Sequence, residues 1–261
     1  MAGKESEIRE RVRARYGEIA RKGSGCCAGS SCGETPETLS LMMGYTRDET
    51  EAVPVGADLG LGCGAPLAMA VLRKGMTVLD LGSGAGFDVF LAARDVGEEG
   101  RVIGVDMTPE MISRARANAR TGGFKNVEFR LGEIEHLPVA DSSVDVVISN
   151  CVLNLSPDKP QVLSEVFRVL KPGGRIVLSD VVARFALPEE IRQNPDLYAG
   201  CMAGAETTEC LEEILHSLGF EEIRISSKDE SRTLIASWAP GAQIENYVIS
   251  AMIEGKKPEG R

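Results

Sequence analysis

Apolar runs, glycine-rich turns and amphipathic segments follow one another through the middle of the chain. Residues 77–81 (TVLDL) form a short apolar run, residues 82–86 (GSGAG) are rich in glycine, and an amphipathic segment begins at Phe87. This order is typical of a strand, a turn and a helix. Glycine suits such a turn because it lets the chain bend sharply and lets a ligand approach the backbone. The pattern therefore predicts a ligand at this turn.

The same alternation continues for about a hundred residues. It predicts strands at 101–106, 127–131, 144–149 and 175–182 and helices at 87–96, 109–120 and 158–170. Strands that alternate with helices indicate a parallel sheet with helices on both faces. We therefore expect an α/β fold with a doubly wound, mostly parallel, seven-stranded sheet of Rossmann-like type.

The segments before and after this core do not show the regular alternation of strands and helices. Before the core we expect an amphipathic helix over 6–21, a helix from Pro36, a short helix within 47–56 and a helix over 66–72. After it, residues 184–210 predict a helical insertion over the carboxyl ends of the strands, where ligands bind in such sheets. Strands at 221–226 and 232–238 are expected to complete the sheet as an antiparallel edge. The tail shows weak helical character over 244–253 and is expected to be partly disordered.

Composition and charge narrow the function classes. Lysine and arginine number 29 against 39 aspartates and glutamates, and the resulting net charge of −10 disfavours binding to nucleic acid or an anionic membrane. No apolar run is long enough to span a membrane, and the charged N-terminus is not a secretory signal. We therefore expect a cytoplasmic location. Seven cysteines, an odd number, then point to thiols with a chemical role rather than to structural disulfides.

The glycine turn differs from a dinucleotide fingerprint. Its spacing is G-x-G-x-G rather than G-x-G-x-x-G, and Asp80 stands two residues before the first glycine. The next strand ends at Asp106, whose carboxylate is suited to accept hydrogen bonds from ribose hydroxyls. Together with the segments LPVADSSVDVVIS and RVLKPGG, these features resemble the class I S-adenosylmethionine methyltransferases over about residues 70–182. This resemblance implies S-adenosylmethionine as cofactor, bound by Asp80, Gly82, Ser83, Gly84, Gly86, Asp106, Met107, Glu133, Ile134 and Asn150.

Three cysteines occupy positions near the expected cofactor site. Cys151 follows a strand directly, Cys201 lies in the insertion, and Cys63 lies in a glycine turn before the core. The glycines beside Cys63 and Cys201 favour exposed, mobile backbone there over a buried position. Cys210 lies outside these contexts, and we expect it to be structural.

The contexts of these cysteines carry a closer resemblance. LGLGCGAP, DLGSGAGFD, VIGVDMTPEM, SNCVLNLSPDK and AGCMAGA together resemble the arsenite S-adenosylmethionine methyltransferases over about residues 7–226. The family implies that Cys63, Cys151 and Cys201 bind trivalent arsenic as thiolates and that an N-terminal cysteine takes part in thiol exchange. Cys32 is our choice for that cysteine from its distance to Cys63, with Cys26 and Cys27 as rivals.

We also expect the chain to divide into three parts, and its residues fit a chemistry that does not depend on the resemblance. An N-terminal helical segment with a cysteine-rich loop (1–72) precedes the methyltransferase domain (73–240), and a tail follows (241–261). Thiolates are soft ligands that select thiophilic centres. Arsenic(III) bound to sulfur keeps a lone pair and has no proton to lose, so no general base is required and neither His136 nor His216 is needed. Alignment of arsenic with the sulfonium methyl group is expected to supply much of the rate. Arsenic is oxidised by the transfer, so we expect a thiol reductant, glutathione or thioredoxin, in a detoxification reaction.

Two alternatives remain open. A small-molecule carbon or oxygen methyltransferase of the quinone type shares the cofactor motifs but has no use for three cysteines. A thiol-based metal or metalloid sensor would use the segment CCAGSSC, yet Cys26, Cys27 and Cys32 make a poor tetrahedral set. The sensor also leaves Asp80 and Asp106 without a purpose.

Overall fold

Seven strands form one sheet at the centre of the molecule. The computed structural model describes residues 2–23, 35–239 and 241–260. The strands lie in the order β3-β2-β1-β4-β5-β7-β6, and their bounds are β1 Thr77–Leu81, β2 Arg101–Asp106, β3 Val127–Leu131, β4 Val144–Asn150, β5 Leu170–Ala183, β6 Glu221–Lys228 and β7 Val248–Lys256. Only β7 runs antiparallel to its neighbours, β5 and β6. The expected mostly parallel, doubly wound sheet is confirmed.

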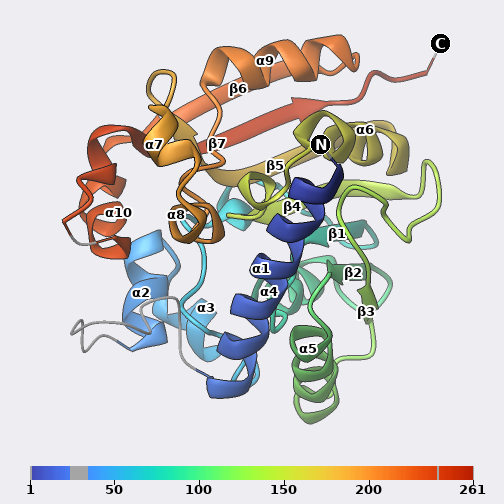
Figure 1. The fold of residues 1–261 in the computed structure, drawn as a ribbon. Helices are drawn as coiled ribbons and strands as arrows, with labels where there is room; N and C mark the ends of the chain where they lie inside the picture. The colour runs from blue at the N-terminus through green and yellow to red at the C-terminus, as the bar shows by residue number, and fades with distance from the viewer. Residues whose placement is uncertain (1, 24–34, 240, 261) are drawn as a thin grey trace.

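Helices cover both faces of the sheet (Figure 1). Their bounds are α1 Ala2–Lys22, α2 Pro36–Met43, α3 Arg47–Glu51, α4 Phe87–Val96, α5 Pro109–Gly122, α6 Lys159–Val169, α7 Glu189–Arg192, α8 Pro195–Ala199, α9 Thr208–Ser217 and α10 Arg232–Trp238. Leu79 and Leu81 of β1 pack in one apolar cluster with α6 and α9. Val78, on the opposite face of the same strand, packs with α4, α5 and α10. This alternation is the period-two pattern of a strand buried on both faces.

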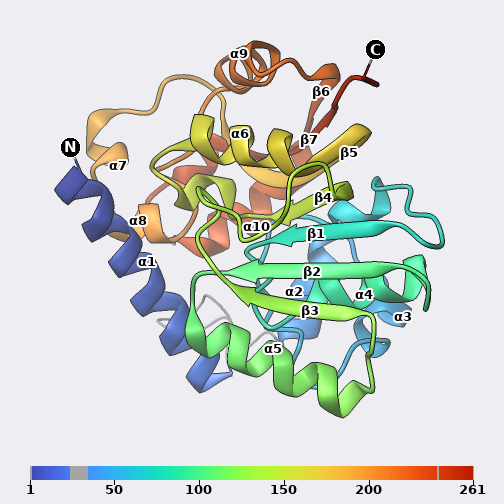
Figure 2. The ribbon, with the colours of Figure 1, turned by 90° about the vertical axis from the view of Figure 1, so that its right-hand side faces the viewer.

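Helix α1 lies across the carboxyl ends of the parallel strands. In Figure 2 the arrowheads of β1, β2 and β3 point toward α1, which is drawn in blue. The helix contacts α5 and α8, and Val12, on its inner stripe, is almost fully buried. The expected amphipathic helix therefore covers the edge at which ligands bind in such sheets.

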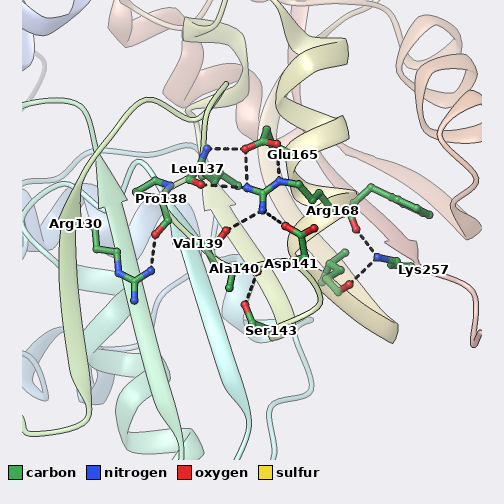
Figure 3. A network of polar contacts seen from close by, with 12 residues as sticks. Arg130, Leu137, Pro138, Val139, Ala140, Asp141, Ser143, Glu165, Arg168 and Lys257 are labelled. Carbon is green, nitrogen blue, oxygen red and sulfur yellow. Dashed lines mark hydrogen bonds and ion pairs between the residues drawn. The ribbon is translucent and has the colours of Figure 1, made fainter.

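The loop between β3 and β4 is fixed by one arginine of α6. Arg168 donates to the backbone oxygens of Val139 (2.9 Å) and Leu137 (3.1 Å), and its guanidinium also pairs with Glu165 (Figure 3). Glu165 in turn accepts a hydrogen bond from Leu137 N. A bidentate guanidinium with several backbone acceptors holds a loop in one geometry. The second half of this loop, residues 137–141, is thereby held against α6.

The C-terminal third differs from the expectation. Residues 232–238, expected as a strand, form α10. Of the helical character expected over 244–253, only the 3₁₀ turn Ile244–Asn246 is present, because β7 fills Val248–Lys256 between β5 and β6. A central strand buried on both faces has apolar residues at nearly every position, so its sequence lacks the alternation that identifies a strand. The helix expected over 66–72 is a single 3₁₀ turn at Pro66–Ala68. The cysteine-rich loop lies outside the described residues.

None of the helices in the described ranges combines the length and the apolar character needed to cross a membrane.

Truncating a buried side chain of β7 tests its central position. Ile253 is 1% exposed and packs in the same cluster as Leu79. Ile253→Ala is expected to lower the free energy of unfolding by about 2–5 kcal/mol, because it removes buried methylene groups and leaves a cavity. Urea denaturation measures this change. Val55→Ala, at a fully exposed position, is the control and is expected to change stability by less than about 0.5 kcal/mol. Equal stabilities of the two variants would contradict the position of β7.

Candidate active site

The glycine turn between β1 and α4 has the geometry that its sequence predicts. Gly82 and Gly84 both have positive φ angles, 65° and 51°. A Cβ on Gly82 would lie 2.4 Å from the Val152 side chain, so no larger residue fits there. The turn is tied to the end of β2, since Gly84 N donates to Asp106 Oδ2 over 2.9 Å. The Val152 side chain thus packs against Gly82, while Gly84 borders open space.

That space is a cavity of about 1470 Å³, including its opening to solvent. It is lined by the glycine turn, the ends of β2 and β4, one side of α1 and residues 200–202. Ser83 Oγ is buried in it and has no hydrogen-bond partner among the described residues. A buried hydroxyl without a partner is costly, so Ser83 is suited to bind a ligand.

Three buried carboxylates line the same cavity. Asp80, Asp88 and Asp106 are 3%, 7% and 9% exposed, and none forms an ion pair with a described residue. Burial raises the pKa of Asp80 well above its usual range, and the charges of Asp88 and Asp106 raise it further. Burial likewise raises the pKa of Asp88 to about 6, although the Tyr45 hydroxyl donates to it over 2.7 Å. Buried acids of this kind favour a ligand that carries positive charge.

The Asn150 amide joins the end of β4 to the loop that carries Cys63. Its Oδ1 accepts from Cys63 N (2.9 Å), and its Nδ2 donates to Gly64 O (2.6 Å) and to the Tyr45 hydroxyl (3.0 Å). Asn150 lines the cavity, as the sequence predicts for a cofactor residue. The structure adds a second role, because the amide also fixes a segment far away along the chain.

The three expected cysteines lie in one buried cluster. Cys151 and Cys201 line the cavity, and the Cys201 thiol donates to Cys151 O over 2.8 Å. The Tyr16 hydroxyl of α1 lies 3.7 Å from Cys201 Sγ, in hydrogen-bond contact. Cys63 lies behind the cavity wall, with its sulfur 3.5 Å from Ser179 Oγ. Across the described ranges, no three His, Cys, Asp or Glu side chains are already arranged to hold a metal ion.

The cysteines of the cluster share a low-dielectric environment. Burial raises the pKa of the Cys151 thiol well above its usual range, and the neighbouring Cys201 and Cys63 thiols raise it further. Cys151 is therefore protonated at neutral pH. Any thiophilic ligand that it binds must displace this proton.

The glycines beside these cysteines serve close packing rather than exposure. Cys63 and Cys201 are 3% and 4% exposed, so the expectation of exposed backbone is wrong. A Cβ on Gly62 would lie 2.7 Å from Asn150 Nδ2, and a Cβ on Gly64 would lie 2.3 Å from Ser179 Oγ. The absence of side chains thus lets the loop press against the ends of β4 and β5.

The structure brings most of the expected site residues to the cavity, but not all of them. The cavity is lined by Asp80, Gly82, Ser83, Gly84, Asp106, Met107, Ile134, Asn150, Cys151 and Cys201. Gly86, Glu133 and Cys63 are not among the lining residues. Glu133 pairs with Arg13 of α1 instead, while the buried Glu135 lines the cavity. Cys32 lies outside the described residues, together with Cys26 and Cys27.

Several lining residues were missed by sequence reasoning. Arg9 and Tyr16 come from α1, and Trp238 comes from α10. Nothing in their local pattern separates them from ordinary residues of an amphipathic helix. Asp88 carried a signal, because an acid two residues after a glycine turn lies in the first turn of the following helix.

The fold and the site define the class of the protein. Residues 72–230 match the methyltransferase domain family, and the sheet order with one reversed strand is that of class I S-adenosylmethionine-dependent methyltransferases. The residues of the cavity fit this cofactor. Its positively charged amino and sulfonium groups complement the buried carboxylates, and Ser83 Oγ supplies a hydrogen-bonding group without a partner.

The comparison with known proteins gives the family within this class. An arsenite methyltransferase of Halobacterium salinarum is 52% identical over 97% of this chain, which covers 67% of that relative. Another, of Aquipseudomonas alcaligenes, is 41% identical over 84% of this chain, which covers 63% of its length. The structure of an arsenic(III) S-adenosylmethionine methyltransferase from Chlamydomonas reinhardtii superposes with a TM-score of 0.63 at 32% identity, over 87% of this chain and 75% of that chain. The chain belongs to the arsenite methyltransferase family.

The quinone-type alternative matches a smaller part of the chain. A demethylmenaquinone methyltransferase of Lactococcus lactis is 43% identical over 103 residues, 40% of this chain and 41% of that protein.

The carboxylates of the cavity predict how cofactor binding depends on pH. The pKa of Asp88 is raised to about 6, so this acid is ionised at pH 7.5 and becomes protonated as the pH falls through 6. Affinity for the cationic S-adenosylmethionine is then expected to fall about threefold to tenfold between pH 7.5 and 5.5, since a protonated site attracts a cation less. Isothermal titration calorimetry measures this change. S-adenosylhomocysteine lacks the sulfonium charge and should show a smaller dependence, and equal slopes for the two ligands would contradict the role of the carboxylates.

Proposed function

We propose that the chain transfers the methyl group of S-adenosylmethionine to thiol-bound arsenic(III), giving methylated arsenicals for detoxification. One observation carries this proposal. Cys151 and Cys201 line the same cavity as Asp80 and Asp106, which are suited to the cofactor. The thiols that recognise arsenic and the carboxylates that attract the methyl donor thus border one space.

Binding of arsenite to these thiols needs no thiolate in advance. Arsenite is neutral As(OH)₃ near neutral pH, and each thiol that bonds to arsenic replaces one hydroxyl, which leaves as water with the thiol proton. A protonated Cys151 is therefore compatible with the reaction, because its proton leaves with the hydroxyl as water. The product is a thiol-bound arsenic(III) that keeps its lone pair.

Cys63 completes the set after a change of side-chain position. Its sulfur contacts Ser179 Oγ, and Cys63 belongs to the same cluster as Cys151 and Cys201, close enough for its thiol to raise the pKa of Cys151. Rotation about one side-chain bond is a small change compared with the gain of an arsenic–sulfur bond. We therefore propose Cys63, Cys151 and Cys201 as the arsenic ligands.

The cofactor, when bound, supplies a methyl group on a cationic sulfur. The protein holds the nucleophile and excludes water: Tyr16 and Val12 of α1 cover the cavity above Cys201. Arsenic has no proton to lose, so no general base is required. We further propose that Cys32 or Cys63 takes part in reducing the oxidised arsenic by forming a disulfide, with glutathione or thioredoxin as outside reductant in a cytoplasmic setting.

The two alternatives explain less of the site. A quinone-type methyltransferase leaves the buried thiol cluster without a purpose. A thiol-based sensor leaves the glycine turn, the orphaned Ser83 hydroxyl and three buried carboxylates without a ligand.

A matched pair of cysteine variants tests the proposal. Labelled S-adenosylmethionine is incubated with the protein, arsenite and glutathione, and methylated arsenic is separated by chromatography. Cys151→Ser is expected to lower the rate of arsenite methylation at least about a hundredfold, because a hydroxyl does not replace a soft thiol ligand. Its affinity for S-adenosylmethionine should remain. Cys210→Ser is the control, because Cys210 lies outside the cluster and is half-buried.

The outcomes separate the functions. Activity retained in Cys210→Ser and lost in Cys151→Ser supports arsenic chemistry at the cavity. If the unaltered protein forms no methylated arsenic, the proposal fails. Equal activity of both variants would remove Cys151 from the mechanism.

The contact between α1 and Cys201 gives a further expectation. Tyr16→Phe removes the hydroxyl in contact with Cys201 Sγ and keeps the ring that packs in the cluster. Arsenite affinity is expected to fall about twofold to tenfold, the usual effect of one hydrogen bond to a ligating group. Quenching of the fluorescence of Trp238 measures it, because this residue is the chain's only tryptophan and lines the cavity. An unchanged affinity would show that α1 does not act on Cys201 through this hydroxyl.

A further inference from the structure

A buried carboxylate and a buried amide lie beneath the thiol cluster without lining the cavity. Asp180 and Asn154 are each 1% exposed, and Asn154 Nδ2 donates to Asp180 Oδ1 over 2.8 Å. Burial raises the pKa of Asp180 to about 6, against the effect of its backbone hydrogen bonds. Burying a carboxylate or an amide is costly unless it is hydrogen-bonded, so the groups to which these two side chains bond show what they hold in place.

The carboxylate fixes the turn that follows Cys151. Asp180 Oδ2 accepts from Leu153 N over 2.8 Å, and Oδ1 accepts from Val181 N over 2.7 Å. Leu153 opens the 3₁₀ turn Leu153–Leu155, two residues after Cys151. Asp180 itself lies on β5, beside the end of β4. The turn after Cys151 is thus held against the neighbouring strand.

The amide fixes the loop that carries Cys201. Asn154 Nδ2 donates to Cys201 O over 3.3 Å and to Val181 O over 2.5 Å. The same loop is seated on the Asn154 backbone, since a Cβ on Gly204 would lie 2.1 Å from Asn154 O. One residue therefore holds a loop that lies 47 positions further along the chain.

Both cysteines adopt a backbone conformation that favours glycine. Their φ angles are 59° at Cys151 and 65° at Cys201, and side chains other than glycine are strained there. Cys201 stands just beyond the C-cap of α8, where glycine is common. A strained conformation persists only when its surroundings hold it, and here it directs both side chains to the cavity wall. Asp180 holds the turn that follows Cys151, and Asn154 holds the loop that carries Cys201.

We propose that Asn154 and Asp180 are positioning residues that hold Cys151 and Cys201 with their sulfurs at the cavity. This inference rests on the proposed arsenic-binding role of the two cysteines. Neither residue lines the cavity. They act through the backbone of the two segments, so their loss should weaken arsenite binding and leave cofactor binding in place.

A pair of asparagine variants tests the inference. Asn154→Leu keeps the branched shape and the number of non-hydrogen atoms of the side chain, and it removes the donors. Asn126→Leu is the matched control, because Asn126 Nδ2 also donates to two backbone oxygens, Ala93 O and Gly97 O, both over 2.9 Å. Asn126 lies before the start of β3, at the edge of the sheet opposite the cavity. Each variant is titrated with arsenite by the fluorescence of Trp238 and with S-adenosylmethionine by calorimetry, in reduced protein.

The expected result is a selective loss. Asn154→Leu should weaken arsenite binding at least about tenfold, the usual effect of removing a group that orients a ligand, and change cofactor affinity by less than about twofold. Asn126→Leu, at a half-buried position, should lower the melting temperature by a smaller amount and change neither affinity. Asn154→Ser, which retains one donor, should recover part of the arsenite affinity. It also carries the test if Asn154→Leu does not fold.

The result that overturns the inference is distinct from failure of the proposed function. If the unaltered protein binds arsenite and folded Asn154→Leu or Asn154→Ser binds it equally well, the two residues do not position the cysteines. Equal losses of arsenite and cofactor affinity would also overturn it, because they would show a general structural effect. If the unaltered protein does not bind arsenite, the proposed function itself fails and the inference falls with it.

Discussion

The amide of Asn150 is the contact on which the geometry of the site depends. It links the end of β4 to the loop of Cys63 through two hydrogen bonds to that loop, and it reaches Asp88 through the Tyr45 hydroxyl. Cys151 follows Asn150 directly in the chain. The same side chain therefore places two cysteines, one carboxylate and the cavity wall relative to one another. The carboxyl ends of the parallel strands form the edge at which the site lies, and this amide determines which segments meet at that edge.

The site buries three carboxyl groups that form no ion pair with a described residue. Asp80, Asp88 and Asp106 border one cavity, and their burial is unfavourable in the absence of a cation. Perturbed carboxylates in a cleft are characteristic of functional sites. Helix α1 makes the burial of these carboxyl groups more complete, because it covers the cavity and limits the access of water. Its ion pair between Arg9 and Glu135 fastens it to the loop after β3.

Local sequence patterns predicted the core of the fold, and the family resemblance implied most of the cofactor side of the site. Strand β1, the glycine turn and α4 have the predicted bounds, because each is determined by residues adjacent in the chain. Strand β7 was missed, since its burial on both faces removes the alternation that marks a strand. The burial of Cys63 was missed for a related reason. In the sequence, Gly62 and Gly64 are typical of an exposed turn. Only the structure shows that their lack of side chains allows close packing against Asn150 and Ser179.

The convergence of the three cysteines on the methyl donor cavity is the central claim, and arsenic X-ray absorption spectroscopy tests it most directly. The spectrum of the protein with one equivalent of arsenite reports the sulfur and oxygen neighbours of arsenic. The account predicts a shell of sulfur alone, with one sulfur replaced by oxygen in each of Cys63→Ser, Cys151→Ser and Cys201→Ser. A shell dominated by oxygen, or a sulfur shell that these substitutions leave unchanged, would contradict it.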